Sequence, residues 1–399
     1  MKVLILHQHF KLPEKGGAIR SYYLAKALVG KGIKTVVVTA HNEPKYRQED
    51  LEGIQVHYLP VPYDNRYGFQ KRILAFYRFI IHSIRFAARH SDADLCYAIS
   101  TPLTTGVAAM IIRKRYGIPY IFEVGDLWPD APIQMGFIRN WFLQRILYRM
   151  ESKIYRKASS IVALSTAIGH CLHGKVSDKT IHLIPNMADT EFFRPAEKRS
   201  ALKEKFGVKE KFVVSYVGAL GVANGLTYYL ECAAACQQAH LPIHFILCGD
   251  GAMLEDLKKQ AAKGVLQNLS IIPFQNRHGV AEILNVTDAN FICYQPVRIL
   301  ETGSPNKYFD GLAAGKMTII NFGGWIKEEI ERCHCGIAVD ARNPEDFVNK
   351  IRGFVDDEPL LRKYQQAGRA LAEEKYARRM LGEKYSDMIT NHIAGSGTR

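Results

Sequence analysis

The densest group of residues that could do chemistry lies in one loop, Glu123-Val-Gly-Asp126-Leu-Trp-Pro-Asp130. The loop follows an apolar run at 120–124 that is typical of a buried strand, and open α/β folds bind ligands at the carboxyl edge of their sheets. Helix capping by Asp126 or Asp130 is the alternative interpretation. Three acids around a Trp-Pro pair in a strand-end loop favour a functional role over simple capping.

A second group predicts a phosphate site. The segment Ser304-Pro-Asn-Lys307-Tyr-Phe-Asp310 begins with a Ser-Pro helix start, whose first N–H groups lack partners inside the helix. Lys307 and Asp310 fall close to one helix face at i, i+3. Free amides with a lysine suit a diphosphate, and a carboxylate suits a ribose diol. The alternative is an ordinary amphipathic helix with a Lys–Asp pair on its surface.

Three glycine loops at predicted strand ends could bring backbone amides close to a ligand. They are Gly16-Gly17, the segment from Gly218 to Leu226 that contains Asn224, and Gly249-Asp250-Gly251. Arg20, one turn into the helix after the first loop, is predicted to add a phosphate-binding guanidinium. Tight turns with an exposed arginine are the alternative.

These groups need a repeated strand–loop–helix scaffold to position them. Apolar runs typical of buried parallel strands recur, with helix-like stretches between them, at 2–7, 35–39, 95–99, 120–124, 160–164, 211–218, 243–248, 269–272, 289–294 and 318–321. A proline-bounded segment at 184–195 separates the two sets, and 399 residues are too many for one ordinary core. We therefore expect an α/β protein with two Rossmann-like domains in tandem. The predicted domains are 1–188 and 189–375, and a last helix at about 376–393 is expected to pack back on the first domain.

Positive charge is concentrated in the first half of the chain. Residues 1–185 contain 26 Lys and Arg against 13 Asp and Glu, whereas the rest contains 27 against 26. This asymmetry predicts an anionic partner: membrane lipid, a phosphorylated acceptor or nucleic acid. Basic and aromatic residues interleave at 71–89 and 139–157, a pattern typical of helices on an anionic membrane surface. Solvated helices with apolar faces in the core are the alternative.

The composition predicts a cytoplasmic protein. Hydrophobic residues make up 47% of the chain and charged residues 23%, as in ordinary globular proteins. The eight cysteines are scattered without a disulfide framework, which fits a reducing compartment. The apolar runs are too short for a signal peptide or a membrane span. We therefore expect a location in the cytoplasm, with peripheral attachment to the inner face of the cell membrane.

Four motifs in order resemble the family-four glycosyltransferases: the Gly16-Gly17 loop, Glu123 to Pro129, Gly218 to Leu226, and Ser304 to Gly315. The chain is similar in particular to the bacterial branch that builds surface polysaccharides such as O-antigen and capsule, including fucosamine-transferase-like proteins. The resemblance implies the GT-B fold, in which the two domains face each other across a cleft, with the acceptor on 1–188 and the nucleotide-sugar on 189–375. It implies retention of anomeric configuration by front-face displacement, and no metal or other cofactor. It also implies a nucleotide-sugar donor, with uridine the commonest base and guanosine an alternative, and a glycan acceptor linked to a lipid diphosphate.

The resemblance also implies roles for individual residues. Asp126 would lie at the reacting sugar as the catalytic residue, with Glu123 supporting it, and Gly16 and Gly17 near the donor phosphates and acceptor. The other donor-binding residues would be Ser304, Asn306 and Lys307 for the diphosphate, Asp310 for the ribose, and Gly218, Asn224, Gly249, Asp250, Gly251, Phe274 and Gln275 around the nucleotide. Many relatives have Arg and Lys in the Gly218 loop, where this chain has Ala219 and Asn224. Neutralisation of the diphosphate would then depend on Lys307, Arg20, backbone dipoles or Arg298.

Two other classes of function remain open. A nucleotide-sugar 2-epimerase shares the GT-B architecture and would form product without an acceptor. A non-enzymatic protein that binds anionic membrane or nucleic acid would explain the charge, but it leaves Asp126 and the 304–310 segment unexplained. The chain has no recognised nucleic-acid motif, so we expect no nucleic-acid partner. Asp92-Ala-Asp94 matches an Asp-x-Asp metal motif, but an acidic turn before a strand is the favoured interpretation.

Overall fold

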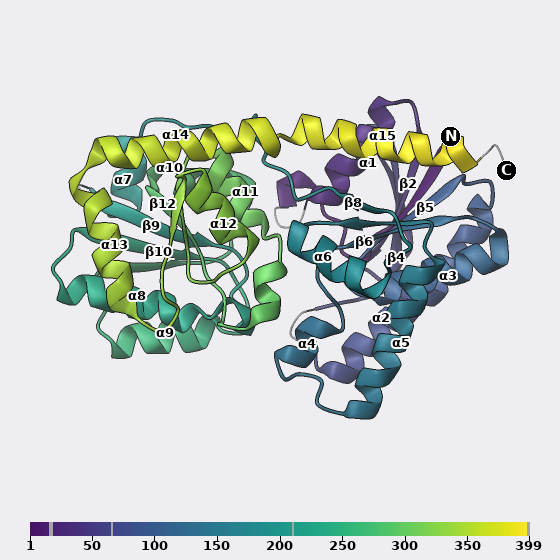
Figure 1. The fold of residues 1–399 in the computed structure, drawn as a ribbon, viewed down its shortest axis with the longest axis horizontal. Coiled ribbons are helices and arrows are strands. Elements are labelled where there is room, and N and C mark those ends of the chain that lie inside the picture. Colours follow the sequence, from purple (N-terminus) through teal and green to yellow (C-terminus); the bar gives the residue numbers. More distant parts are fainter. Residues whose placement is uncertain (16–18, 65–66, 210, 397–399) are drawn as a thin grey trace.

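Two α/β domains lie side by side in the computed structural model (Figure 1). The structure describes residues 1–15, 19–64, 67–209 and 211–396, so the predicted site residues Gly16 and Gly17 lie outside the described residues. Each domain is built on a mainly parallel sheet with helices on its faces. The predicted fold class, two Rossmann-like domains in tandem, is confirmed.

The N-terminal domain contains an eight-stranded sheet in the order β3-β4-β2-β1-β5-β6-β7-β8, in which only the β3–β4 pair is antiparallel. Its strands are β1 (Lys2–Leu6), β2 (Lys34–His41), β3 (Arg47–Leu51), β4 (Ile54–Pro60), β5 (Leu95–Ile99), β6 (Tyr120–Val124), β7 (Ser160–Ala163) and β8 (Ile181–Leu183). Its helices are α1 (Arg20–Gly30), α2 (Phe69–Ala87), α3 (Thr104–Tyr116), α4 (Asp130–Gln134), α5 (Trp141–Lys157) and α6 (Thr166–Lys175), with short 3-10 helices η1 (Pro13–Lys15) and η2 (Ala88–His90).

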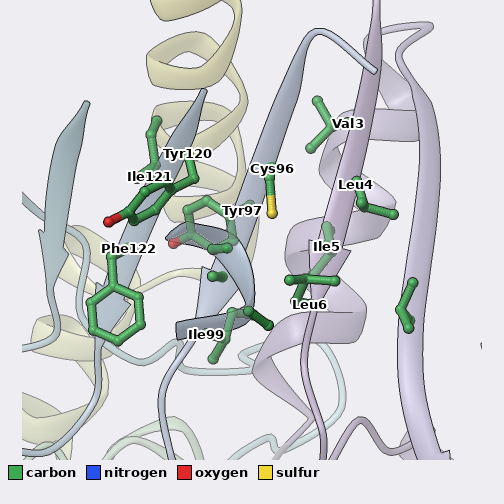
Figure 2. Packing of buried hydrophobic residues seen from close by; sticks show 14 of the residues in the cluster. Val3, Leu4, Ile5, Leu6, Cys96, Tyr97, Ile99, Tyr120, Ile121 and Phe122 are labelled. Carbon is green, nitrogen blue, oxygen red and sulfur yellow. The ribbon is translucent and has the colours of Figure 1, made fainter. Parts of the chain in front are cut away.

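The central strands of this sheet are continuous apolar runs because both of their faces are covered. All five residues of β1, of β5 and of β6 are buried. Leu4 of β1 pairs with Val36 on one side and with Cys96 on the other. Figure 2 shows side chains from β1, β5 and β6 packed together in this core. A parallel sheet with both faces buried reads in the sequence as an uninterrupted apolar run, which is why these strands were predictable.

The C-terminal domain contains a six-stranded parallel sheet in the order β11-β10-β9-β12-β13-β14. Its strands are β9 (Phe212–Val217), β10 (Ile243–Cys248), β11 (Leu269–Ile272), β12 (Ala289–Ile292), β13 (Met317–Ile320) and β14 (Gly336–Ala338). Its helices are α7 (Ser200–Lys205), α8 (Leu226–Gln238), α9 (Leu254–Lys263), α10 (Arg277–Val286), α11 (Asn306–Ala313), α12 (Trp325–Arg332), α13 (Pro344–Asp356) and α14 (Glu358–Lys375), with 3-10 helices η3 (Val222–Asn224) and η4 (Arg298–Thr302). The chain order reverses between β9 and β12, and such a switch point is where open α/β sheets bind ligands.

The chain passes between the domains twice, and the two passages pair with each other. The amide of Ala188 donates to the carbonyl of Tyr376, and the amide of Arg378 donates to the carbonyl of Ala188. Beyond this point α15 (Arg378–Ser396) packs against α1 of the N-terminal domain. Tyr385 and Ile389 are fully buried in that domain's core. Figure 1 shows α14 and α15 running one after the other along the same side of both domains.

Candidate active site

Two glycine loops meet at the switch point of the C-terminal sheet. A Cβ atom at Gly249 would lie 1.8 Å from the carbonyl oxygen of Gly218, and Gly249 has φ +155°. The amide of Leu220 donates to the carbonyl of Asp250 at 2.9 Å, which fixes one loop on the other. Only glycine allows this backbone-to-backbone contact. The predicted loops at Gly218 and Gly249–Gly251 therefore form one surface at the carboxyl ends of β9 and β10.

Lys307 points at this surface from the first turn of α11. Its Nζ donates to the hydroxyl of Tyr216 at 2.6 Å and to Oδ1 of Asn224 at 3.4 Å. A Cβ atom at Gly218 would lie 3.0 Å from Cε of Lys307, so a side chain there would displace the lysine. Burial lowers the pKa of Lys307 to about 7, although the nearby thiol of Cys293 opposes the shift. Among the described residues no carboxylate pairs with Lys307, so its charge is available to an anionic ligand.

The start of α11 has the properties of an anion site. The segment before it is held through its carbonyl oxygens: Ser165 Oγ donates to Thr302 at 2.6 Å, and Asn186 Nδ2 donates to Ser304 at 2.5 Å. The hydroxyl of Ser304 is buried and has no hydrogen-bond partner among the described residues. The amides of Asn306 and Lys307 come first in the helix, where N–H groups lack intrahelical partners and carry partial positive charge; the next amide, that of Tyr308, donates to the carbonyl of Pro305 at 3.0 Å. Phosphate oxygens satisfy such donors.

Asp310 lies one turn further along α11 and faces a cation. Burial raises the pKa of Asp310 to about 7, and the guanidinium of Arg277 in α10 opposes that shift. Arg277 also donates from Nη1 to the hydroxyl of Tyr23 in α1 at 2.9 Å. Asp310 therefore lies on the side of the C-terminal domain that meets the N-terminal domain.

Asp126 supplies the acidic group on the opposite domain. It follows β6, is exposed, and accepts a long hydrogen bond of 3.4 Å from Thr101 Oγ1. Surrounding protein raises the pKa of Asp126 by withdrawing it from water, and the Thr101 contact opposes this. Burial and then the charge of Asp126 raise the pKa of Tyr294, which follows β12 in the other domain. The charge of Asp126 therefore acts on the C-terminal domain at the carboxyl end of β12.

The prediction that Arg20 binds donor phosphate is wrong. Its side chain is buried, and Nε and Nη2 each donate to the carboxylate of Glu123 at 3.0 Å. Nη1 and Nη2 also donate to the carbonyls of Pro185 and Ile184 at 2.5 and 2.8 Å. These four bonds occupy the guanidinium and attach α1 to the segment that leads into the C-terminal domain.

Glu123, which was predicted to support Asp126, lies inside the N-terminal domain. Only 1% of it is exposed, and besides Arg20 it accepts a hydrogen bond from the hydroxyl of Tyr97. Its carboxylate is therefore enclosed within the N-terminal domain and does not reach the space around Asp126. Because Glu123 lies three residues before Asp126, it is a positioning residue that fixes the end of β6.

The other predicted donor residues lie at the same edge of the C-terminal sheet with few side-chain contacts. Oδ1 of Asp250 accepts from the amide of Gly251 at 2.8 Å, and Gln275 Nε2 donates to the carbonyl of Pro273 at 3.2 Å. Phe274, just after β11, is 54% exposed, so its ring is accessible for stacking on a planar group. Arg298, the alternative partner of the diphosphate, instead lines a polar cavity of about 650 Å³ beside the ends of β12, β13 and β14, together with Glu301.

Sequence reasoning missed three residues that shape the site: Tyr216, Arg277 and Tyr294. Tyr216 lies inside a strand, where an aromatic residue normally indicates core packing. Arg277 and Tyr294 follow strands without any glycine or motif that marks them. Asp130, by contrast, pairs with Lys175 at 2.5 Å and is a structural residue of its loop. Asp92 and Asp94 hold the side chain and the amide of Lys2, as an acidic turn would.

Comparison with known proteins assigns the chain to a family. Residues 15–187 match the "Glycosyl transferase 4-like domain", and residues 198–371 match "Glycosyl transferases group 1". The chain belongs to the family-four glycosyltransferases. Its two domains have the GT-B arrangement of that family.

Characterised relatives share low sequence identity with this chain. An alpha-D-kanosaminyltransferase of Streptomyces kanamyceticus is 21% identical over 240 residues, which are 59% of this chain and 61% of the relative. A UDP-Gal:alpha-D-GlcNAc-diphosphoundecaprenol alpha-1,3-galactosyltransferase of Escherichia coli is 26% identical over 276 residues, 64% of this chain and 65% of the relative. The chain thus spans less than two thirds of the length of these relatives.

Solved structures share the fold over the whole chain. Sucrose-phosphate synthase of Thermosynechococcus elongatus superposes with a TM-score of 0.80 at 14% identity, covering 99% of both chains. HepE of Anabaena, solved in complex with UDP and glucose, superposes with a TM-score of 0.72 at 16% identity, covering 98% of this chain and all of that one. At these identities the likeness concerns the fold.

We predict that Arg20→Met will lower stability without weakening nucleotide binding. Removing one partner of a buried ion pair costs about 3–5 kcal/mol. Lys26→Met is a matched control in the same helix, because the Lys26–Glu52 pair is exposed and such pairs contribute about 0–1 kcal/mol. Urea unfolding and UDP titration would measure both effects. UDP binding tenfold weaker in folded Arg20→Met would contradict the structural role.

The pKa of Lys307 predicts how donor binding depends on pH. The protonated ammonium binds phosphate, so affinity for UDP should be highest near pH 7 and fall toward tenfold per pH unit between pH 8 and 9. Arginine stays protonated in this range. Lys307→Arg should therefore remove most of the alkaline loss. Calorimetric titration at several pH values would measure it, and a wild-type affinity that is constant up to pH 9 would contradict the assignment.

Proposed function

We propose that this protein transfers a sugar from a UDP-sugar to a lipid-linked glycan acceptor, with retention of anomeric configuration, during bacterial surface polysaccharide synthesis such as that of O-antigen or capsule. The observation that carries the proposal is that each of the two domains contributes residues to the proposed site. The half-buried Lys307 lies at the start of α11 in one domain, and the charge of Asp126 in the other domain acts on Tyr294, which follows β12 of the first. The name of the Escherichia coli relative, with its UDP-sugar donor and diphospholipid acceptor, supports the substrate classes.

In this proposal the donor diphosphate binds between the start of α11 and the two glycine loops. Lys307, the hydroxyl of Ser304 and the first amides of α11 provide the donors, while Asp310 accepts from the ribose hydroxyls. As the bond between the sugar C1 and the phosphate oxygen breaks, negative charge develops on the diphosphate. Fixed donors aimed at that charge stabilise the transition state most when water is excluded. Lys307 and the helix amides supply this stabilisation, so the proposed reaction requires no metal ion.

The acceptor hydroxyl attacks C1 on the face that the diphosphate leaves, which preserves the configuration. The bond from the acceptor oxygen to C1 forms as the old bond breaks, and the hydroxyl proton passes to the leaving phosphate oxygen. Asp126 lies on the opposite domain and makes one long contact, so it can bind hydroxyls of the reacting sugar or of the acceptor. Holding the acceptor hydroxyl close to C1 on this face is worth several kcal/mol of the barrier.

The surface of the N-terminal domain supports an acceptor at the membrane. On α2 and α5 the large apolar side chains that are exposed are Ile73, Leu74, Tyr77, Trp141, Phe142, Ile146 and Tyr148. Trp141 is 71% exposed, and an open groove of about 750 Å³ along α5 is lined by basic side chains, Arg145, Arg149, Lys153, Arg156 and Lys157. Exposed aromatic residues beside cations are typical of helices on anionic bilayers. Within the described residues, no helix combines the length and apolarity needed to cross a membrane.

A nucleotide screen tests the donor. UDP and UDP-sugars should raise the melting temperature of the wild type, and GDP should do so less. Lys307→Met with Asp310→Ala should abolish the shift, whereas Lys327→Met with Asp340→Ala, at the neighbouring polar cavity, should retain it. Absence of any nucleotide-dependent shift would overturn the donor assignment, and sugar-nucleotide conversion without an acceptor would indicate an epimerase.

Vesicle binding tests the membrane surface. Arg145→Glu with Arg149→Glu should weaken binding to phosphatidylglycerol vesicles at least tenfold, since each basic residue near an anionic surface contributes about 1 kcal/mol. Lys258→Glu with Lys259→Glu, on α9 of the other domain, carries the same charge change and should bind like the wild type. Co-sedimentation would measure both. Equal binding by the two variants would contradict the proposed surface.

A further inference from the structure

A cluster of rings and cations at the carboxyl edge of the N-terminal sheet is not used by the proposed donor site. It is formed by the loop after β1, the loop after β4, and the first two turns of α2. We call it the β1–α2 cluster; its rings are His9, Tyr63, Tyr67 and Phe76, and its cations are Lys11, Lys71 and Arg72.

The rings lie next to one another around Tyr63, tilted against His9 and Tyr67 and stacked on Phe76, with the cations beside them. The His9 and Tyr63 rings are 4.7 Å apart between centroids, and Tyr63 stacks on Phe76 at 5.7 Å. The guanidinium carbon of Arg72 lies 6.0 Å from the centre of the Tyr63 ring, and Nζ of Lys71 lies 5.7 Å from that of Tyr67. These distances place the cations at the edge of cation–π range, where the rings orient them without neutralising their charge.

The cations of the cluster lie around an imidazole that is itself neutral near pH 7. Burial, followed by the charges of Lys11 and Arg72, lowers the pKa of His9 to about 4. Within the described part of the chain, none of the three cations forms an ion pair with a carboxylate. Like charges gathered around a neutral ring raise the free energy of the unliganded site, so a bound anion would relieve repulsion as well as gain contacts.

The β1–α2 cluster lies between Asp126 and the exposed apolar side chains of α2. His9 follows β1 and Asp126 follows β6, which are separated by β5 in the sheet. Adjacent strands are about 4.8 Å apart, so the two strand ends lie about 10 Å apart. On the other side, α2 continues from Arg72 with Ile73, Leu74 and Tyr77, of which 49%, 47% and 59% are exposed. A ligand that spans the cluster from Asp126 to the exposed residues of α2 needs an anionic centre. It also needs a polar end toward Asp126 and an apolar end along α2.

We propose that the β1–α2 cluster binds the phosphate groups of the lipid-linked acceptor. Lys11, Lys71 and Arg72 bind phosphate oxygens, the glycan extends toward Asp126, and the hydrocarbon chain leaves along the exposed apolar side of α2. The inference rests on the proposed function, because it assigns the acceptor side of the same reaction. It concerns the N-terminal domain alone, and can therefore fail while the donor site stands.

Binding of farnesyl diphosphate to the full chain tests this inference. Saturating UDP is included so that the donor site is occupied, and the probe is kept below its micellar concentration. Lys11→Gln with Arg72→Gln should weaken binding about tenfold. The matched control is Lys114→Gln with Arg115→Gln, which removes the same two charge types from the exposed end of α3 and should bind like the wild type. Farnesol and inorganic pyrophosphate serve as probes for the chain and the phosphates separately.

The outcomes separate this inference from the proposed function. Equal farnesyl diphosphate affinity in wild type and in both variants would overturn it, as would farnesol binding as tightly as farnesyl diphosphate. Inorganic pyrophosphate that binds as tightly as farnesyl diphosphate would overturn the apolar path along α2. UDP affinity is measured on each protein: retained UDP binding confines a failure to the acceptor side, whereas loss of UDP binding in the wild type would remove the proposed function itself. Lys11→Gln with Lys71→Gln, both exposed, provides a second variant if Arg72→Gln does not fold.

Discussion

The donor-binding residues of the C-terminal domain and Asp126 of the N-terminal domain can act together only if the two domains are held face to face. This arrangement depends on the hydrogen bonds that the carboxylate of Asp189 accepts. In the first passage between the domains it accepts hydrogen bonds from Arg277 of the C-terminal domain, from Nη1 of Arg378 at 2.8 Å, and from the Tyr23 hydroxyl at 3.2 Å. Asp189 is only 4% exposed, and the Arg277 guanidinium stacks 3.8 Å above the Phe192 ring. Without this carboxylate, two arginines would face each other with little solvent to screen them.

Burial also sets the charge state of the site that these contacts assemble. It lowers the pKa of Lys307 to about 7, raises that of Asp310 to about 7, and raises that of Asp126. In the unliganded site Lys307 and Asp310 are thus partly neutral near pH 7, because withdrawal from water disfavours every charge. A diphosphate beside Lys307 would restore the cation, so that donor binding and proton uptake are linked. Sensitivity to pH near neutrality is therefore built into the proposed donor site.

The parts of this structure that were predictable from the sequence are those with local signals. Central strands are apolar runs, the glycine loops follow them, and Ser304–Asp310 has the pattern of a helix start. Strands β3, β4, β8 and β14 were not predicted. Short and partly exposed edge strands such as Arg47–Leu51 carry no apolar run, and in β4 the apolar run is interrupted by Gln55 and His57. The role of Arg20 was mistaken since its partner Glu123 is 103 residues away, and only the folded sheet brings β6 beside α1. Arg277 was not predicted either, because its partners Tyr23 and Asp189 are also distant in the sequence.

Hydrogen–deuterium exchange with and without UDP tests most directly the central claim, that a nucleoside diphosphate binds between the glycine loops and α11. The account predicts slower exchange in three places: residues 218–226, residues 249–253 and the first turn of α11. It predicts unchanged exchange in α9 and α13 of the same domain. Protection confined to the polar cavity beside β14, or no protection at saturating UDP, would contradict the account.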